Sequence, residues 1–464
     1  MAGARPSAEC PGCRSLGQEN ARLQARVAKV EQQRAELQRR LEEQQRAGQR
    51  QATPFRRRHP KAKPKRPGRA KGHAGAQRGR PEQVDHVVEV PLEVCPTCQT
   101  PLAEKAVHEQ WQIDIPPIHP QVTQCNIQAG YCPRCQRRVQ GRDPRQISDA
   151  VGAAGTQIGP VLLSMGAELK HRLGVPYRKI CDFFATYLAV EVCPATLVRA
   201  EQRLVEAALP SYQLLIEALR RCHVVHADET GWRIAQVNAW LWVFSSQTVT
   251  VYVIEFSRGH GVPEAMLGPT FAGVLVVDGL KSYDVLAYQK GRCVGHVLRR
   301  TGQLVEMLTG IDQYYVEEVQ GVLREAMALA QRREQLTERG YWRRVQQVEA
   351  RLDLWLTWHG AEPGAEVQRL ARHVAAHREE WLRFLYDPEV PATNNHAERM
   401  LRPAVICRKI GGCNKSVLGA VVHGVLASLA VSCKQQGKRF MDLALALFRS
   451  PVPQAIPVEG LPDG

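Results

Sequence analysis

The sequence lacks both a long hydrophobic run and a leader segment. No uninterrupted apolar stretch reaches the ~18 residues that a membrane-spanning helix requires. The first ten residues, MAGARPSAEC, carry no hydrophobic core of a secretory signal. The 14 cysteines among 464 residues are too sparse for a disulfide-stapled secreted scaffold. We therefore expect a cytoplasmic protein without membrane contact, divided into domains of ~100–200 residues each.

Acidic residues are absent from residues 54–80, which hold 11 Lys or Arg. The whole chain has a formal net charge of +16, so this one segment supplies most of the excess. It is rich in Pro and Gly and cannot build a core, which predicts a basic disordered linker over residues 48–84. The linker would neutralise DNA phosphates, or else it is only a solvated connection. The candidates for DNA contact in it are Arg56, Arg57, Arg58, Lys61, Lys63, Lys65 and Arg66.

Before the linker, residues 16–41 follow a heptad pattern. Leucine occupies three d positions, Val27 lies at an a position, and Asn20 lies at another. Leu at d with Val at a favours a two-stranded parallel coil, and one Asn at a fixes the register. We expect a coiled coil over residues 14–47 that forms a homodimer or a higher oligomer. A lone amphipathic helix is the alternative, but so polar a helix would have nothing else to bury.

Two CxxC motifs follow the linker. Cys95 and Cys98 form CPTC, Cys132 and Cys135 form CPRC, and each motif comes after a strand-like run. Zn²⁺ takes four tetrahedral ligands, and two such turns supply two thiolates apiece. This spacing predicts a zinc ribbon-like domain over residues 85–145 with a structural Zn²⁺ held by these four cysteines.

Residues 150–220 have apolar positions at spacings of three and four, which predicts a helical domain. Around the turn EVCP the pattern resembles a helix-turn-helix, which either contacts DNA or is ordinary helix packing. From residue 222 the apolar period changes to two. CHVVHADET, WLWVFSS, TVTVYVIEF and GVLVVDG are expected to be strands, with the helical stretch VPEAMLG before the last.

This strand order is that of the opening of an RNase H-like α/β sheet. We therefore predict a multidomain α/β protein, in which the coiled coil, zinc ribbon-like domain and helical domain precede an RNase H-like catalytic domain. The catalytic domain covers residues 221–450 and contains a large helical insertion at about 302–388, where charged helical patterning returns. Residues 451–464 are expected to be a disordered tail.

Three acidic residues stand out in this domain. Asp228 and Asp278 each follow an apolar run, and Glu398 lies on an expected helix. Two carboxylates at the ends of neighbouring strands would repel, and a hard divalent cation removes that repulsion. Each acid alone has an ordinary explanation: a turn or cap for the aspartates, and a surface pair with Arg402 for the glutamate. Glu229 is assigned a structural role, because neighbouring strand residues point to opposite faces.

These blocks resemble the transposases of the insertion sequence 66 family over nearly the whole chain. HADET with WLWV is similar to the family's first-Asp block, VVDGLKSY to its second, and NNHAERMLRP with the later Arg-Lys pair to its Glu block. Cys293 and His296 match a C-x-x-H element that follows the second block. The resemblance implies a DDE triad of Asp228, Asp278 and Glu398 that holds Mg²⁺ or Mn²⁺.

The resemblance has two departures. An aromatic usual after the second Asp is replaced by Gly279 and Leu280, and an aromatic-rich stretch near the end of the Glu block is IGGCNKS. Neither departure removes a metal ligand. Further candidates for DNA contact around the triad are His296, Arg399, Arg402, Arg408 and Lys409.

The function implied is that of a DNA transposase. It would cleave the ends of a mobile element by phosphoryl transfer and join the 3′-hydroxyl to target DNA. The expected partners are double-stranded DNA, at terminal inverted repeats and target, a second copy of the chain, and accessory proteins that often accompany the family. The alternatives are a nuclease of the same fold without strand transfer, and a non-enzymatic zinc-containing DNA-binding protein.

Overall fold

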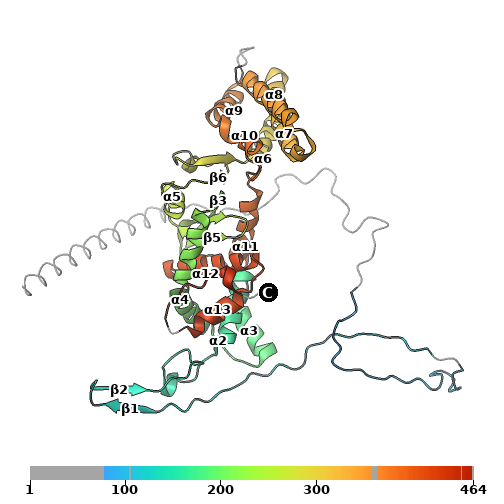
Figure 1. Ribbon diagram of the computed structural model, residues 1–464, viewed down its shortest axis with the longest axis vertical. Helices are drawn as coiled ribbons and strands as arrows, with labels where there is room; N and C mark the ends of the chain where they lie inside the picture. The colour runs from blue at the N-terminus through green and yellow to red at the C-terminus, as the bar shows by residue number, and fades with distance from the viewer. Residues whose placement is uncertain (1–77, 104–105, 358–362, 451, 462–464) are drawn as a thin grey trace, which may run out of the picture.

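The computed structural model describes residues 78–103, 106–357, 363–450 and 452–461. The expected coiled coil and the seven linker candidates for DNA contact lie outside the described residues. The described chain is a mixed α/β protein with one five-stranded sheet and many helices (Figure 1). This architecture agrees with the α/β part of the predicted fold class and is consistent with an RNase H-like DDE domain.

The central sheet has the strand order β5-β4-β3-β6-β7. The first three strands in sequence form an antiparallel meander, and the last two run parallel to β3. All four predicted strands are present. The fifth was not predicted, because its sequence QKGR is short and polar. The strands are β3 (Val224–Ile234), β4 (Val237–Ser245), β5 (Thr250–Glu255), β6 (Val274–Val277) and β7 (Gln289–Arg292).

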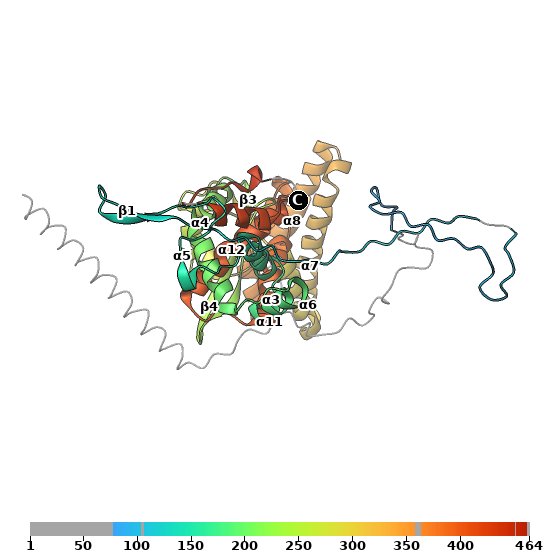
Figure 2. The same ribbon diagram turned by 90° about the horizontal axis from the view of Figure 1, so that it is seen from below.

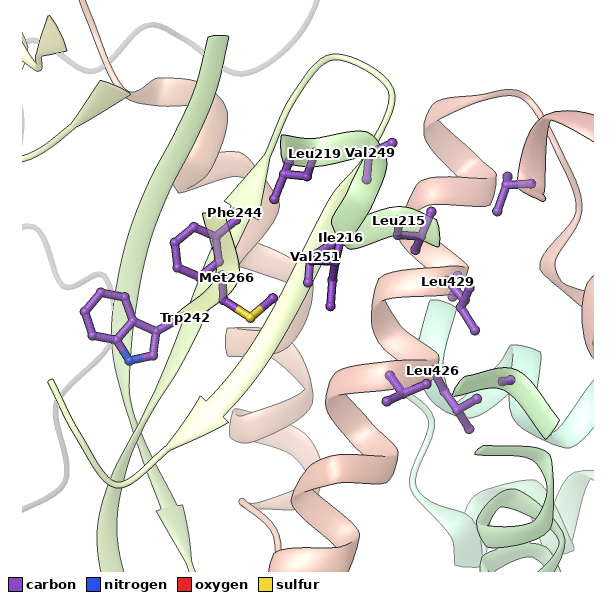
Figure 3. Close-up of a cluster of buried hydrophobic side chains, with 14 of the residues drawn as sticks. Leu215, Ile216, Leu219, Trp242, Phe244, Val249, Val251, Met266, Leu426 and Leu429 are labelled. Carbon is purple, nitrogen blue, oxygen red and sulfur yellow. The ribbon is translucent and has the colours of Figure 1, made fainter. Parts of the chain in front are cut away.

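Alternation along β4 supplies both faces of the sheet with apolar side chains. Trp242 and Phe244 point to one face, where they join a cluster with Val251 and residues of the covering helices (Figure 3). Leu241 and Val243 point to the other face, against a different cluster. Helices cover both faces: α4 (Pro194–Arg220), α5 (Gly261–Leu267), α11 (Asn395–Gly411), α12 (Val417–Gln435) and α13 (Phe440–Arg449).

Helix α12 covers the free edge of β5. Ser428 accepts a hydrogen bond of 2.8 Å from the backbone of Tyr252, and Ser432 both accepts from and donates to the backbone of Thr250 at 3.0 Å. A Cβ at Gly424 would lie 3.2 Å from the Tyr252 carbonyl, so glycine permits this close approach. These contacts satisfy backbone groups that an uncovered edge strand would leave open.

By length and composition alone, α12 is also apolar enough to cross a membrane, although the expectation from sequence was that no such segment exists. Most of the helix is buried inside the protein, as a core helix is. Among the described residues it is the one helix with this property.

The helical insertion starts with α6, which begins at Val294, before the predicted start at about residue 302. It has its own core, in which Tyr315 and Trp355 are in ring contact and exchange hydrogen bonds with each other's backbone carbonyl. Figures 1 and 2 show it gathered at one end of the sheet. Its helices are α6 (Val294–Met307), α7 (Gly310–Gln331), α8 (Glu338–Leu356), α9 (Ala365–Ala376) and α10 (Arg378–Tyr386).

The predicted helical domain is formed by α2 (Pro160–Ala167), a π-helical turn, α3 (Tyr177–Leu188) and the first half of α4. The turn between α3 and α4 passes through Ala189, which has a left-handed φ of 53°. The part before it differs from the sequence prediction. The strand expected before the first CxxC motif is absent, and only an isolated bridge joins Val94 to Pro101. The second motif starts at the last residue of β1 (Ala129–Cys132) and continues into the turn before β2 (Arg137–Gln140).

The prediction of a disordered tail was wrong for its described part. Val458 is buried in the main core, and the backbone of Ile456 donates a hydrogen bond of 2.9 Å to Ser211 in α4. The sequence VPQAIPVEG has too few apolar residues for a periodic signal, yet single apolar side chains find room between helices.

Candidate active site

Asp228 and Asp278 lie at the same level of neighbouring parallel strands. His226 in β3 pairs with Val276 in β6, and two residues further along each strand stand the two aspartates. Parallel register places such residues on the same face of a sheet. Asp278 directly follows β6 as predicted, whereas Asp228 lies inside β3 rather than after it, opposite Val243 of β4.

Glu398 reaches this region from the first turn of α11. Asn394, directly before this helix, fixes the position of that turn. Its side-chain amide donates a hydrogen bond of 2.7 Å to the carbonyl of Ala227, and its oxygen lies 2.9 Å from Nδ1 of His226. The backbone N–H of Glu398 donates to the Asn394 carbonyl at 3.3 Å. One buried side chain therefore connects the strand of Asp228 to the helix of Glu398.

Asp278 and Glu398 both act electrostatically on Asp228. Burial, together with the negative charges of Glu229, Asp278 and Glu398, raises the pKa of Asp228 to about 8. Across the described chain, no basic side chain forms an ion pair with Asp228 or Asp278, and Glu398 has only long contacts of 3.9 Å with His296 and Arg299. Uncompensated carboxylates of this kind suit a hard divalent cation.

The side chains are not drawn together as a finished coordination sphere. No three His, Cys, Asp or Glu groups in the part of the chain that the structure describes converge closely enough to hold a metal ion. Charges influence one another over longer distances than a metal–ligand bond spans. Asp278 and Glu398 can therefore raise the pKa of Asp228 without lying close enough to hold one ion together with it. The three acids share one region, and ligation of one ion would need their side chains to move closer.

Glu229 has the structural surroundings expected for it. Its side chain is 2% exposed and accepts hydrogen bonds from Arg258 at 2.7 and 3.1 Å. The hydroxyl of Tyr283 donates a third at 3.3 Å. The Arg258 guanidinium neutralises this carboxylate, whereas no such partner serves Asp228.

The candidates for DNA contact near the triad separate into two groups. Arg399, Arg402 and Lys409 are exposed on α11, and His296 is half-buried beside Glu398. Arg408 is 4% exposed and donates to the carbonyl of Gly231 and to the hydroxyl of Thr230 in β3. Its assignment as a DNA contact is therefore wrong in this structure. The guanidinium instead satisfies backbone and hydroxyl groups of the strand that carries Asp228.

The structure does not bring the two CxxC motifs together, and they lie in separate parts of the N-terminal region (Figure 1). Locally the motifs share one geometry, because Gln99 and Gln136 directly after them both have positive φ, 60° and 50°. The backbone N–H of Cys135 donates to the sulfur of Cys132 at 3.4 Å, which lowers the pKa of that thiol. Hydrogen bonding with Thr100 lowers the pKa of Cys98 to about 7. The zinc site stays a prediction.

Sequence reasoning missed Asn394 and Arg299. Asn394 lies four residues before Glu398 in NNHAER, and a cap residue at the start of a helix was the available signal. Arg299 lies one turn after His296 on α6, so it shares that helix face.

We compared the chain with models of known protein families and with curated proteins. The family model described as Transposase IS66 family matches residues 155–422, which include β3 to β7, the insertion and all three acids. A comparison with curated proteins found no match. The matched region covers more than half of the chain, and it contains the sheet and helix that carry the acidic cluster. The chain therefore belongs to the IS66 family of DDE transposases.

Proposed function

We propose that this transposase cleaves the ends of its own mobile element and joins the freed 3′-hydroxyls to target DNA. Membership of the family implies DNA transposition, DNA binding and a divalent metal at the catalytic site. Asp228, Asp278 and Glu398 are the proposed ligands of Mg²⁺ or Mn²⁺. A bound cation supplies the positive charge that activates the attacking oxygen and stabilises the leaving oxygen.

Both proposed steps are displacements at phosphorus. In the first, a water oxygen bonds to the phosphorus at the element end while the bond to the 3′-oxygen breaks; the water loses one proton to solvent, and the departing 3′-oxygen takes one up to become a hydroxyl. In the second, the freed 3′-hydroxyl oxygen loses its proton and attacks a target phosphorus, and the displaced 3′-oxygen of the target takes up a proton. One phosphodiester is exchanged for another, so no energy source is needed. Asn394 has a positioning role, since it holds the turn of Glu398 against the strand of Asp228.

The observation that carries the proposal is the acidic cluster itself. Asp228 is half-buried, lies near further carboxylates and has no basic partner among the described residues, so its charged form is disfavoured in the metal-free protein. A protein that only needed stability would neutralise such a group, as Arg258 neutralises Glu229. A cation-binding catalytic role explains why this negative charge is left uncompensated.

The remaining sequence predictions belong to the same proposal. The basic linker and exposed Arg399, Arg402 and Lys409 would contact phosphates of the terminal inverted repeats. The coiled coil would pair two copies, and the CxxC motifs would hold a structural Zn²⁺. We also propose that accessory proteins of the element act with the transposase and that it is located in the cytoplasm.

The test uses the full chain with labelled DNA that contains the element ends. With Mg²⁺ we expect a cleaved strand and a strand-transfer product, and neither with EDTA. Asp278→Asn should abolish both, because an amide oxygen cannot replace a carboxylate as a ligand of comparable charge. Cleavage without transfer would favour a nuclease of the same fold. Transposition in cells that survives Asp278→Asn would refute the triad.

A further inference from the structure

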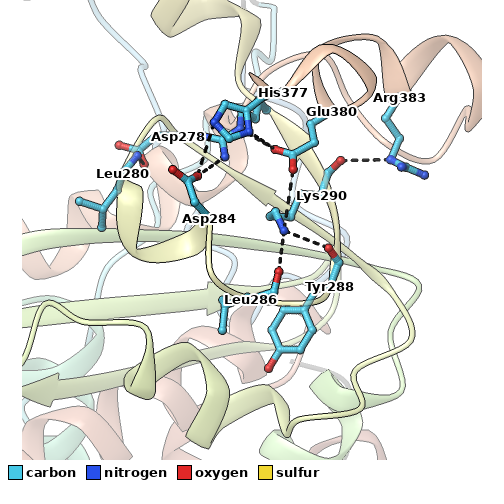
Figure 4. Close-up of polar contacts among 10 residues, drawn as sticks. Asp278, Leu280, Asp284, Leu286, Tyr288, Lys290, His377, Glu380 and Arg383 are labelled. Atoms are coloured by element: carbon cyan, nitrogen blue, oxygen red, sulfur yellow. Dashed lines mark hydrogen bonds and ion pairs between the residues drawn. The ribbon is translucent and has the colours of Figure 1, made fainter. Parts of the chain in front are cut away.

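The helical insertion is attached to the sheet close to Asp278 through a buried ionic network. Arg292, at the end of β7, is fully enclosed and pairs with Asp284 and, at 2.5 Å, with Glu380 of α10. Arg383 of α10 donates a hydrogen bond of 3.0 Å to the carbonyl of Lys290. Figure 4 shows Asp284 and His377 close to Asp278, with Glu380 and then Arg383 further along α10. Breaking a buried pair of this kind is costly, so α10 has a fixed position relative to the sheet.

The same network orients the end of α9. His377 follows α9 and lies 3.5 Å from Glu380 and 3.8 Å from Asp284. One turn earlier on α9, the ring of His373 packs edge-on against His377 and Trp381, with centroids 5.5 and 5.4 Å apart. These contacts restrict the imidazole of His373 to one side of the helix.

That side faces the backbone directly after Asp278. A Cβ built on Gly279 would have Nε2 of His373 as its nearest neighbour, at 3.9 Å. Gly279 is exposed and His373 is half-buried. Neither ring nitrogen of His373 makes a hydrogen bond to any residue that the structure describes. A rigidly packed imidazole without a protein partner therefore lies beside the residue that follows the second aspartate.

The chemistry around His373 suits an anion. Arg300, which is exposed, contributes positive charge there, whereas the charges of Arg292 and Asp284 largely offset each other. Asp284 is already paired with Arg292. An Nε2–H group among such neighbours can donate to a phosphate oxygen, which is the acceptor that a DNA strand presents most often.

We propose that His373 of the helical insertion binds a phosphate of the DNA strand that lies in the active site, next to Asp278. The inference rests on the proposed function, and it makes the insertion a part of the active site. Glycine at position 279 leaves room for this contact. An alanine methyl there would make ordinary contact with the imidazole, whereas a larger side chain would extend into the space that the phosphate needs.

The experiment measures single-turnover cleavage of element-end DNA by the full chain with Mg²⁺. His373→Ala should slow cleavage by about 10- to 100-fold, the usual effect of losing one hydrogen bond to a charged group. His373→Gln should recover part of the rate, because its amide nitrogen can reach the position of Nε2. The control Arg372→Ala removes an exposed charge from the same helix and should stay within about twofold of the wild type.

A second series leaves His373 unchanged. Gly279→Ala should cleave nearly as fast as the wild type, and Gly279→Leu should be as slow as His373→Ala. This pair keeps the proposal testable even if His373→Ala fails to fold, which circular dichroism would reveal. Normal cleavage by Gly279→Leu would overturn the proposal.

Replacing single DNA phosphates by neutral methylphosphonates identifies the contact. In the wild type, one position near the cleavage site should lose rate on replacement, and in His373→Ala that same replacement should cost nothing further. Equal losses in both proteins at every position, or a His373→Ala rate within twofold of the wild type, would overturn the proposal alone. A wild type that does not cleave with Mg²⁺ would overturn the proposed function, and this inference with it.

Discussion

The side-chain amide of Asn394 donates a hydrogen bond of 2.7 Å to the carbonyl of Ala227, the residue directly before Asp228. Asn394 also precedes Glu398 by one helical turn, so a single buried amide sets the separation between two acids that are 170 positions apart in the sequence. Because a substitution of Asn394 can break this contact and leave both carboxylates in place, it tests the positioning of the acids separately from their ability to bind metal.

Asn394→Ala should therefore impair activity while all three acids remain. The substitution leaves the Ala227 carbonyl and His226 without their partner inside the protein, at a cost of about 1–3 kcal/mol in the free energy of unfolding. Cleavage should fall at low Mg²⁺ and recover partly at high Mg²⁺, since misplaced ligands weaken metal affinity. The neighbouring Asn395→Ala, at an exposed position, is the control. Equal activity of the two variants would contradict the positioning role.

The pKa of Asp228 predicts how stability changes with pH. Because its pKa rises from 3.8 to about 8 on folding, its contribution to stability is full below pH 4 and is lost as the pH rises through 8. With EDTA, the melting temperature should fall over this range. Asp228→Asn should flatten that fall, since an amide does not ionise, and Asp149→Asn at an exposed site should not.

Mg²⁺ gives the complementary measurement. It should stabilise the wild type more at pH 8 than at pH 6, because the cation binds the ionised carboxylate. Asp228→Asn should lose most of this stabilisation. A pH dependence that is the same in the wild type and in Asp228→Asn would show that another group is responsible.

The sequence predicts the strands better than it predicts contacts between distant segments. The strand segments within residues 224–277 are rich in apolar residues that recur at short spacing, and this local pattern indicates burial without knowledge of distant contacts. β7 has no such alternation, and its place depends on pairing with β6. The acids of the triad could be named from their blocks, but Asn394 and His373 could not, because their partners lie far away in the chain.

Arg408 illustrates the same difficulty for charged residues. An arginine beside Lys409 in a transposase-like block was interpreted as a DNA contact, and composition alone cannot distinguish it from a buried arginine that serves backbone carbonyls. Arg408 is buried because α11 packs on β3, a contact between segments about 180 positions apart in the chain that composition does not report.

The adjacent pair Arg408 and Lys409 provides a matched prediction. Arg408→Ala should lower the free energy of unfolding by about 2–5 kcal/mol, since it leaves buried acceptors in β3 unpaired. Lys409→Ala should leave urea unfolding unchanged. It should instead weaken DNA binding and reduce the slope of log Kd against log salt by about 1. The reverse pattern would restore Arg408 as a DNA contact.

Zinc analysis tests the N-terminal cysteines. The two motifs share Cys-Pro-x-Cys-Gln with the final Gln in a left-handed conformation, and hydrogen bonds lower the thiol pKa of Cys98 and Cys132. Lowered thiol pKa values favour the thiolate that Zn²⁺ binds. Protein purified without chelators should contain about one Zn²⁺ per chain. Cys132→Ser should lose it, while Cys125→Ser, outside both motifs, should keep it. Metal-free wild-type protein, or equal zinc in both variants, would exclude a site shared by the two motifs. Should zinc be present, its removal ought to increase proteolysis between residues 78 and 145, because the ion would be what draws these separated turns into one domain.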